Sequence, residues 1–169
     1  MLRRVVRVMD AISDVTGHLM GWLIFVLMAL ILVEVFTRYV LPSAPLAVAD
    51  EMGGYALVAV TYLGLGYTWK EGGHVRVEFL VNALPQGAQK YLRLITLVLA
   101  TILSAVMIVA SYQLINLTIL FGNRSGSWLR VPLQWPQMSL VVGSILLFLQ
   151  QLAELVKTVG ALCTAERAT

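Results

Sequence analysis

The sequence predicts an all-α integral membrane protein with four transmembrane helices, short interfacial helices and both termini in the cytoplasm. Of the 169 residues, 59% are apolar and only 12% are charged, whereas ordinary soluble domains have about 45–50% and about 25%. The charged residues lie in short clusters between long apolar segments, which favours a membrane protein over one that binds nucleic acid. Because a helix in lipid satisfies its own backbone hydrogen bonds, we expect a single membrane domain over residues 1–169.

The first expected span covers residues 15–37 and carries no Asp, Glu, Lys or Arg before Glu34. Basic residues ahead of it and the small residues at 47–49 resemble parts of a signal peptide. However, the apolar run is longer than that of a typical signal peptide, so we expect it to remain as a helix. Arg38 follows Glu34 by four residues, which is the favoured order for an ion pair on a helix. This pair either anchors the outer end of the span or contacts a partner.

Three further spans are expected at residues 52–70, 94–121 and 134–154. The uncharged run from 52 to 69 has 18 residues, which reach about 27 Å as a helix and just cross a hydrocarbon core of about 30 Å. The uncharged run from 94 to 123 has 30 residues and reaches about 45 Å, so one of its ends should protrude from the bilayer.

The connection between the second and third spans predicts a short helix on the membrane surface. Gly72-Gly73 should end the second helix. The apolar residues of segment 75–84 then follow the spacing of a single helix face, which is typical of a helix lying at the headgroup boundary. Trp69 would anchor that boundary, and His74 and Arg76 would contact lipid headgroups or a partner subunit.

Neither histidine predicts a cofactor site. His74 and Glu78 have the spacing of one helix face, but two ligands do not complete a zinc site. His18 and His74 both lie near span ends, yet nothing in the sequence places them across one pocket, as axial ligands of haem would be. We therefore expect no metal, no cofactor and no catalytic residues.

The distribution of Lys and Arg predicts the orientation. With four spans, both termini and the middle connection lie on one side, which carries nine basic residues against three on the other. Positive charge is retained in the cytoplasm, so we expect both termini there. The nine are Arg3, Arg4, Arg7, Lys70, Arg76, Lys90, Arg93, Lys157 and Arg167, and the three are Arg38, Arg124 and Arg130.

The spans carry the marks of helix packing rather than those of transport. The middles of all four expected spans lack ionisable residues, which mark ion paths and proton relays. Small and polar residues instead recur on one face of the third and the fourth span, where they permit close helix approach. They are Thr96, Ala100, Ser104, Ser111 and Thr118, and Ser139, Gly143, Gln150 and Glu154. This combination predicts a subunit with large helical surfaces.

Three local motifs follow one another along almost the whole chain: PLAVADE at 45–51, Tyr62-Leu63-Gly64 with GGHVRV at 72–77 and Leu84-Pro85, and RVPLQWP at 130–136. By their order and spacing the chain resembles the small membrane subunit of tripartite ATP-independent periplasmic (TRAP) transporters, the DctQ-like four-helix subunit. Val48 replaces a Trp that the family often has, and Gly53-Gly54 replaces an Arg that follows its acidic pair.

The resemblance implies a role in sodium-coupled uptake of organic acids across the bacterial inner membrane. In that family a large multi-span permease carries substrate and sodium by an elevator motion, and a periplasmic protein delivers the substrate. The small subunit packs against the fixed scaffold of the large one. Asp50, Glu51, Arg124 and Arg130 would then either touch the periplasmic protein or be plain solvated loop charges.

Two other classes of function stay open at this point. A self-contained small exporter working as a dimer would need an acidic residue near the middle of its first helix, and Glu34 lies near the outer end. A haem anchor or membrane enzyme would need paired histidines or a catalytic set at membrane depth.

Overall fold

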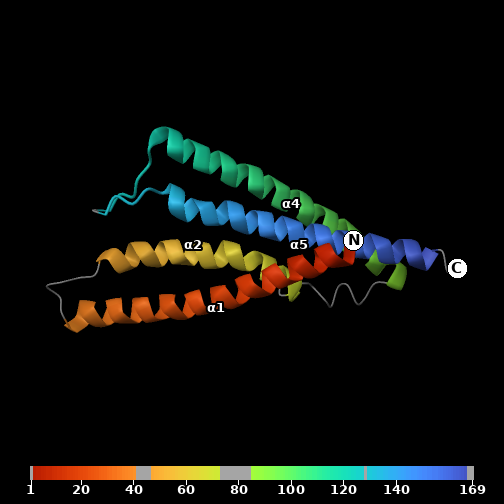
Figure 1. The fold of residues 1–169 in the computed structure, drawn as a ribbon, viewed down its shortest axis with the longest axis horizontal. Coiled ribbons are helices and arrows are strands. Elements are labelled where there is room, and N and C mark those ends of the chain that lie inside the picture. The colour runs from red at the N-terminus through yellow and green to blue at the C-terminus, as the bar shows by residue number, and fades with distance from the viewer. Residues whose placement is uncertain (1, 41–46, 73–84, 128, 167–169) are drawn as a thin grey trace.

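The computed structural model describes residues 2–40, 47–72, 85–127 and 129–166. Within these ranges the chain forms four long helices, labelled in Figure 1: α1 (Leu2–Val40), α2 (Ala47–Lys70), α4 (Gln86–Phe121) and α5 (Gln134–Glu166). The described ranges hold no strand, only an isolated antiparallel bridge between Arg124 and Pro132. The predicted all-α class is therefore confirmed. The expected interfacial helix at 75–84, with His74 and Arg76, lies outside the described residues.

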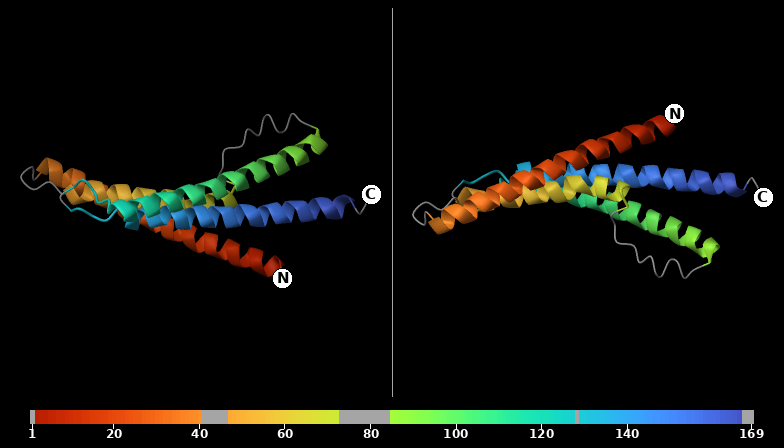
Figure 2. Two further views of the ribbon diagram at one scale, coloured as in Figure 1. Left: turned by 90° about the horizontal axis from the view of Figure 1, so that it is seen from above. Right: turned by 90° about the horizontal axis from the view of Figure 1, so that it is seen from below.

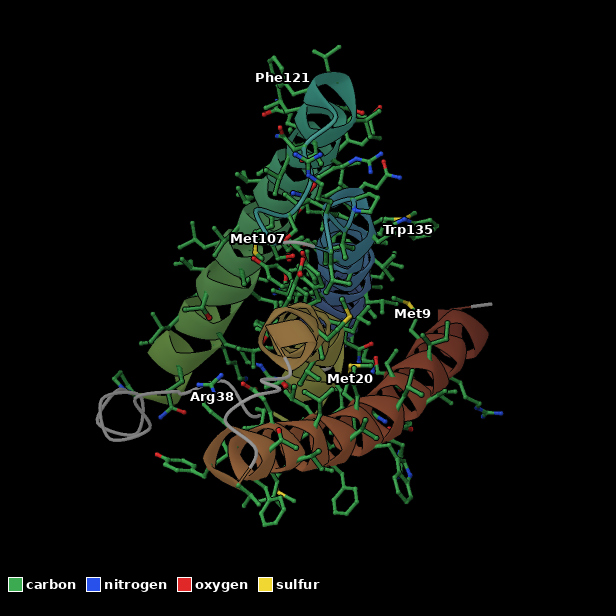
Figure 3. The ribbon with its side chains drawn as sticks, turned by 90° about the vertical axis from the view of Figure 1, so that its left-hand side faces the viewer. Met9, Met20, Arg38, Met107, Phe121 and Trp135 are labelled. Carbon is green, nitrogen blue, oxygen red and sulfur yellow. The ribbon has the colours of Figure 1, made fainter. Side chains whose placement is uncertain are left out.

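The helices are arranged side by side in the order α1, α2, α5, α4, with α2 and α5 in the centre (Figure 1). The α1–α2 and α4–α5 pairs run antiparallel, whereas α2 and α5 run parallel (Figure 1). Seen end-on in Figure 3, α1 and α4 occupy opposite flanks of this row. The buried side chain of Met20 lies between α1 and α2 (Figure 3). Each flanking helix consequently exposes a long face.

Both termini lie at one end of the row, together with the end of α2 and the start of α4 (Figure 1). Towards this end the first turns of α1 and α4 diverge from α5, as both views in Figure 2 show. At the opposite end lie the end of α1, the start of α2 and the connection between α4 and α5 (Figure 1). We call the end with both termini the terminal end and the opposite end the loop end.

Glycines in the left-handed region close two of the helices. Gly72, two residues beyond the end of α2, has φ +68°, and the Gly72 N–H donates to the Trp69 carbonyl at 3.1 Å. Gly122 follows α4 with φ 61°, and the next N–H, that of Asn123, donates to the Thr118 carbonyl at 3.0 Å. Glycine is favoured at such a cap because it has no Cβ to collide with the preceding carbonyl.

The interior of the row is small and polar, while the surface is apolar. Among the described residues the buried apolar side chains are few, and polar ones outnumber them; exposed large hydrophobics cover α1 and α4. Three of the described helices contain segments long and apolar enough to cross a membrane, namely Met9–Val40, Ala88–Phe121 and Gln134–Gly160. This distribution is that of a protein whose surface meets lipid, where helices associate through small and polar residues.

Candidate functional site

A close backbone approach joins the two central helices. A Cβ built on Gly143 of α5 would lie 2.2 Å from the carbonyl oxygen of Tyr62 on α2. One turn further along, a Cβ on Gly66 would meet the backbone of Leu146 at 3.6 Å. Gly143 therefore permits backbone-to-backbone contact between α2 and α5. The sequence placed Gly143 on a packing face, and the structure identifies Tyr62 as its neighbour.

The interface between α4 and α5 is lined by polar side chains one heptad apart. The Ser104 hydroxyl donates to Oε1 of Gln151 at 2.7 Å, and both side chains are buried. Ser111 and Thr118, seven and fourteen residues beyond Ser104, are buried as well. Ser144 of α5 is 0% exposed, and its hydroxyl oxygen has no hydrogen-bond partner in the described structure.

The small-residue stripe expected on α4 is shorter in the structure than in the sequence. Thr96 is exposed, and its hydroxyl donates to the carbonyls of Leu92 and Arg93 in its own helix. Ala100 is half-buried. The stripe leaves the interface at this level because α4 diverges from α5 towards the terminal end (Figure 2). On α5, Ser139 likewise bonds within its own helix, donating to the Pro136 carbonyl at 2.6 Å.

A hydrogen-bonded network ties α1 to α5 and α2 near the terminal end. Gln150 of α5 accepts from the Ser13 hydroxyl at 3.3 Å and donates to the Asp10 carboxylate at 3.1 Å. Lys157 lies 3.7 Å from the same carboxylate. Lys70 of α2 forms an ion pair with Asp14 of α1. The sequence analysis singled out Gln150 but missed its partners on α1, which lie more than a hundred residues away in the chain.

A second link crosses from α2 to α4 through one carboxylate of α5. The indole N–H of Trp69 donates to Oε2 of Glu154 at 2.7 Å. Arg93 of α4 donates to the other oxygen, Oε1, at 3.1 Å. Trp69, predicted as a boundary anchor, therefore also joins two helices, and Glu154 lies where three of them meet.

At the loop end of α1, Arg38 donates to the carboxylate of Glu34. The Glu34 residue is only 5% exposed although it lies within the apolar Met9–Val40 segment. An ion in such a position needs an opposite charge, which Arg38 supplies from the more exposed side. Both partners lie in the last two turns of α1, and contact of this pair with a partner protein stays a prediction.

Glu51 holds the loop between α4 and α5 onto α2. The Tyr55 hydroxyl donates to its Oε1 at 2.6 Å, and the Ser127 hydroxyl donates to Oε2. Hydrogen bonds from Ser125, Ser127 and Tyr55 keep the pKa of Glu51 below its ordinary value. The loop itself is folded back by the Ser125 N–H, which donates to the Val131 carbonyl at 2.9 Å. Glu51 thus has partners within the chain.

The other charged residues predicted at the loop end lie on the loop between α4 and α5 and in the first turn of α2. Arg124 and Arg130 are both exposed on the loop between α4 and α5. Arg130 has φ 46°, in the left-handed region where residues other than glycine are uncommon. Asp50 lies in the first turn of α2. Contact of these residues with a periplasmic protein remains a prediction.

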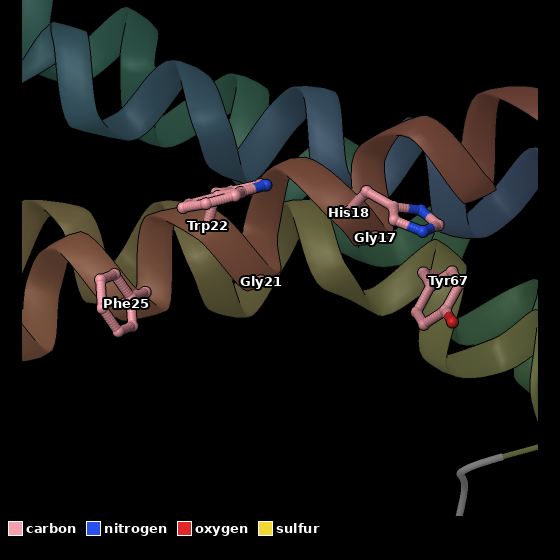
Figure 4. A pocket seen from close by; sticks show the side chains of 6 residues that line it. All are labelled: Gly17, His18, Gly21, Trp22, Phe25 and Tyr67. Carbon is pink, nitrogen blue, oxygen red and sulfur yellow. The ribbon is translucent and has the colours of Figure 1, made fainter.

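A shallow groove runs along α1 at its contact with α2 (Figure 4). It is lined by Gly17, Gly21, Trp22, Phe25 and Tyr67, with His18 at one end. A Cβ on Gly17 would lie 2.4 Å from the Tyr67 ring, so this glycine lets the ring rest against the α1 backbone. A Cβ on Gly21 would meet nothing within 4 Å, so only the first glycine of the GxxxG pair makes a close contact.

Among the described residues His18 is the one histidine, and it bonds to its own helix. Nδ1 of His18 lies 2.8 Å from the Asp14 carbonyl in the preceding turn, which requires the proton on that nitrogen. The second histidine lies outside the described residues. No group of three or more His, Cys, Asp or Glu side chains among the described residues is placed to hold a metal ion.

Comparison with known families agrees with this arrangement of packing surfaces. The profile described as "Tripartite ATP-independent periplasmic transporters, DctQ component" matches residues 27–161, well over half of the chain. No curated protein is significantly similar to the chain. Members of this family work with a large permease and a substrate-binding protein, and they are transporter components rather than enzymes. The chain is thus a membrane protein of the DctQ family, the small permease component of tripartite ATP-independent periplasmic transporters.

Proposed function

We propose that the chain is the stationary subunit of a sodium-coupled transporter that takes up organic acids across the bacterial inner membrane. The large permease carries substrate and sodium, and a periplasmic protein delivers the substrate. The chain binds the fixed scaffold of the large permease and enlarges it. It contributes no transport site of its own.

The observation that carries this proposal is the way the row of helices is locked together. Close backbone contact fixes α2 to α5 at Gly143, and Glu154 joins α2, α5 and α4 through Trp69 and Arg93. Gln150 and Asp10 hold α1 to α5. A transport domain that moves across a membrane needs a rigid scaffold that does not move. These links between helices make the chain rigid, as a stationary subunit has to be.

We further propose that α2 is the fourth transmembrane span. Its 24 residues reach about 36 Å as a helix, enough to cross a hydrocarbon core of about 30 Å. It is not among the three described segments that are long and apolar enough to cross a membrane by composition alone, and it contains several Gly, Tyr and Thr residues. Its position between α1 and α5 leaves Tyr55, Tyr62 and Tyr67 partly covered, whereas the exposed Thr61 bonds to a carbonyl of its own helix.

Both termini are then cytoplasmic. The terminal end of the row carries Arg7, Lys70, Lys90, Arg93 and Lys157, and the positive-inside rule assigns such an end to the cytoplasm. Cys163 is the single cysteine in the chain and lies near the C-terminus, which makes it a natural topology probe. In intact spheroplasts a membrane-impermeant maleimide should label Cys163 only after the membrane is opened. As a control, Gly126→Cys in a Cys163→Ser background should react without opening.

Two observations count against the other functions. Glu34 is buried and paired with Arg38, so it is poorly placed to exchange protons in a self-contained exporter. His18 is exposed, and the described residues place no second histidine across a pocket from it, as the axial pair of a haem anchor would be.

The test is purification of the tagged chain from native membranes in mild detergent. A stoichiometric large polytopic protein should accompany it, whereas a lone homodimer would contradict the proposal. Uptake of radiolabelled organic acids into proteoliposomes, with all three components and an inward sodium gradient, tests the transport role. Uptake should require the gradient and this chain together.

A further inference from the structure

Two amide side chains lie on the outer face of α4, within its membrane-spanning segment. Gln113 and Asn116 are both exposed and sit eight and five residues before the end of the Ala88–Phe121 segment. At 1.5 Å per residue these positions lie about 12 Å and about 8 Å along the helix from that end. The exposed side chains around them are Val109, Tyr112, Leu117 and Leu120.

Two amides of α5 are placed differently, although the buried Oε1 of Gln137 on the same helix also has no partner in the described structure. Gln150 and Gln151 of α5 are buried, and each is hydrogen-bonded to a neighbouring helix. Exposed threonines such as Thr61 donate their hydroxyls to a carbonyl in their own helix. The side-chain amides of Gln113 and Asn116 make no hydrogen bond within the described part of the chain, although each can donate two and accept two.

Hydrocarbon cannot replace these missing bonds. Lipid tails have no hydrogen-bonding groups, so an amide that faces them stays unsatisfied. For this reason polar residues in spanning helices usually face other protein, and Asn and Gln promote helix association in membranes. The two amides sit one turn apart on a single face, so one partner helix can reach both.

The opposite flank of the row has no such feature. Between residues 19 and 36 the exposed positions of α1 are all apolar, which suits contact with lipid chains. The two flanks therefore differ in chemistry, and only the α4 flank, within the described residues, carries amides at membrane depth.

We infer that this face of α4 binds a membrane-spanning helix of the large permease subunit, whose polar groups complete the hydrogen bonds of Gln113 and Asn116. The inference rests on the proposed function, which supplies the large permease as the membrane partner. It goes further by assigning the contact to one helix face and by requiring a hydrogen-bonding group on the partner helix.

The first test replaces both amides by leucine in the full chain, co-expressed with the large permease. The Gln113→Leu/Asn116→Leu variant should retain the permease about tenfold less well in a detergent titration, because two interhelical bonds are lost. The isolated variant should be at least as heat-stable as wild type, since leucine suits lipid. A matched control on α1, Met28→Leu/Leu32→Ile, should leave retention unchanged.

The outcomes separate the inference from the proposed function. If wild type does not bind the large permease, the proposed function fails. If wild type binds and the double-leucine variant binds equally well, the assignment of the α4 face is wrong while the function stands.

Photo-crosslinking gives an independent measurement. Benzoylphenylalanine at position 113 or 116 should form an adduct with the large permease, and at position 28 it should not. An adduct with a second copy of the chain, or with lipid alone in an intact complex, would overturn the inference.

Discussion

Replacing Gly143 by alanine tests the central contact of the structure. The added methyl carbon would lie 2.2 Å from the Tyr62 carbonyl oxygen and 2.4 Å from the carbonyl carbon. Ordinary van der Waals contact begins at 3.4 Å, so α2 and α5 must separate locally by about 1.2 Å, the difference between 3.4 and 2.2 Å. The obstacle is backbone, which cannot rotate away as the end of a flexible side chain can.

The expected loss of stability follows from two destabilising terms and one stabilising term. Overpacking of a well-packed interface costs about 1–3 kcal/mol, and a rigid obstacle places the value near the upper end. A gap of this size also removes about a quarter to a half of the dispersion energy of the atom pairs affected. Alanine restores about 1 kcal/mol of helix propensity relative to glycine. The net loss should be about 2 kcal/mol, which lowers Tm by about 4–8 °C in a chain of this size.

The assay is thermal unfolding of the purified chain in detergent, followed by tryptophan fluorescence. Gly64→Ala is the matched control, because it makes the same substitution on α2 where a Cβ meets nothing within 4 Å. That variant should keep or raise Tm through helix propensity alone. If Gly143→Ala is as stable as Gly64→Ala, the helices do not approach as closely as the structure indicates.

Three further outcomes are expected. Ser104→Trp should disturb helix association, because the side chain is 1% exposed between α4 and α5; wild-type yield and permease retention would refute its packing role. Trp69→Phe should cost about 1–2 kcal/mol through loss of an indole bond to a carboxylate, whereas Trp22→Phe, at a 71% exposed position, should change Tm little. Hydrogen bonds from Ser125, Ser127 and Tyr55 lower the pKa of Glu51, so the attachment of segment 122–133 should be complete above the ordinary pKa of a glutamate and be lost as pH falls through the lower folded pKa. Hydrogen exchange of the segment should show this change, and Glu51→Gln should abolish its pH dependence.

Much of the fold could be predicted from composition and period. Long uncharged runs predicted the helices, and Gly72 and Gly122 lie where α2 and α4 have ended. The helices are longer than the expected spans at the terminal end. There α1 begins at Leu2 and α5 continues to Glu166, because amphipathic turns extend them beyond the apolar runs.

The candidate surfaces could be predicted only in part. Small residues on the third and fourth spans indicated close packing, and Ser104 and Gly143 do lie at interfaces. The sequence could not assign Gly143 to α2 and Ser104 to α5, since spacing along one helix does not identify its neighbour. The sequence also did not distinguish exposed amides from buried ones. Gln113 and Gln151 are both glutamines within apolar helices, and only the packing of neighbouring helices makes the first exposed and the second buried.

The sequence by itself determined the helical class, the family and the excess of apolar surface. These properties depend on local hydrogen bonding and on side-chain chemistry, which adjacent residues specify. The tertiary structure alone decided that the helices form an open row with α2 and α5 at its centre. It also brought Asp10 to Gln150 and Glu51 to Ser127. Such contacts depend on which helices meet, and the helical period of one segment carries no information about the segment across from it.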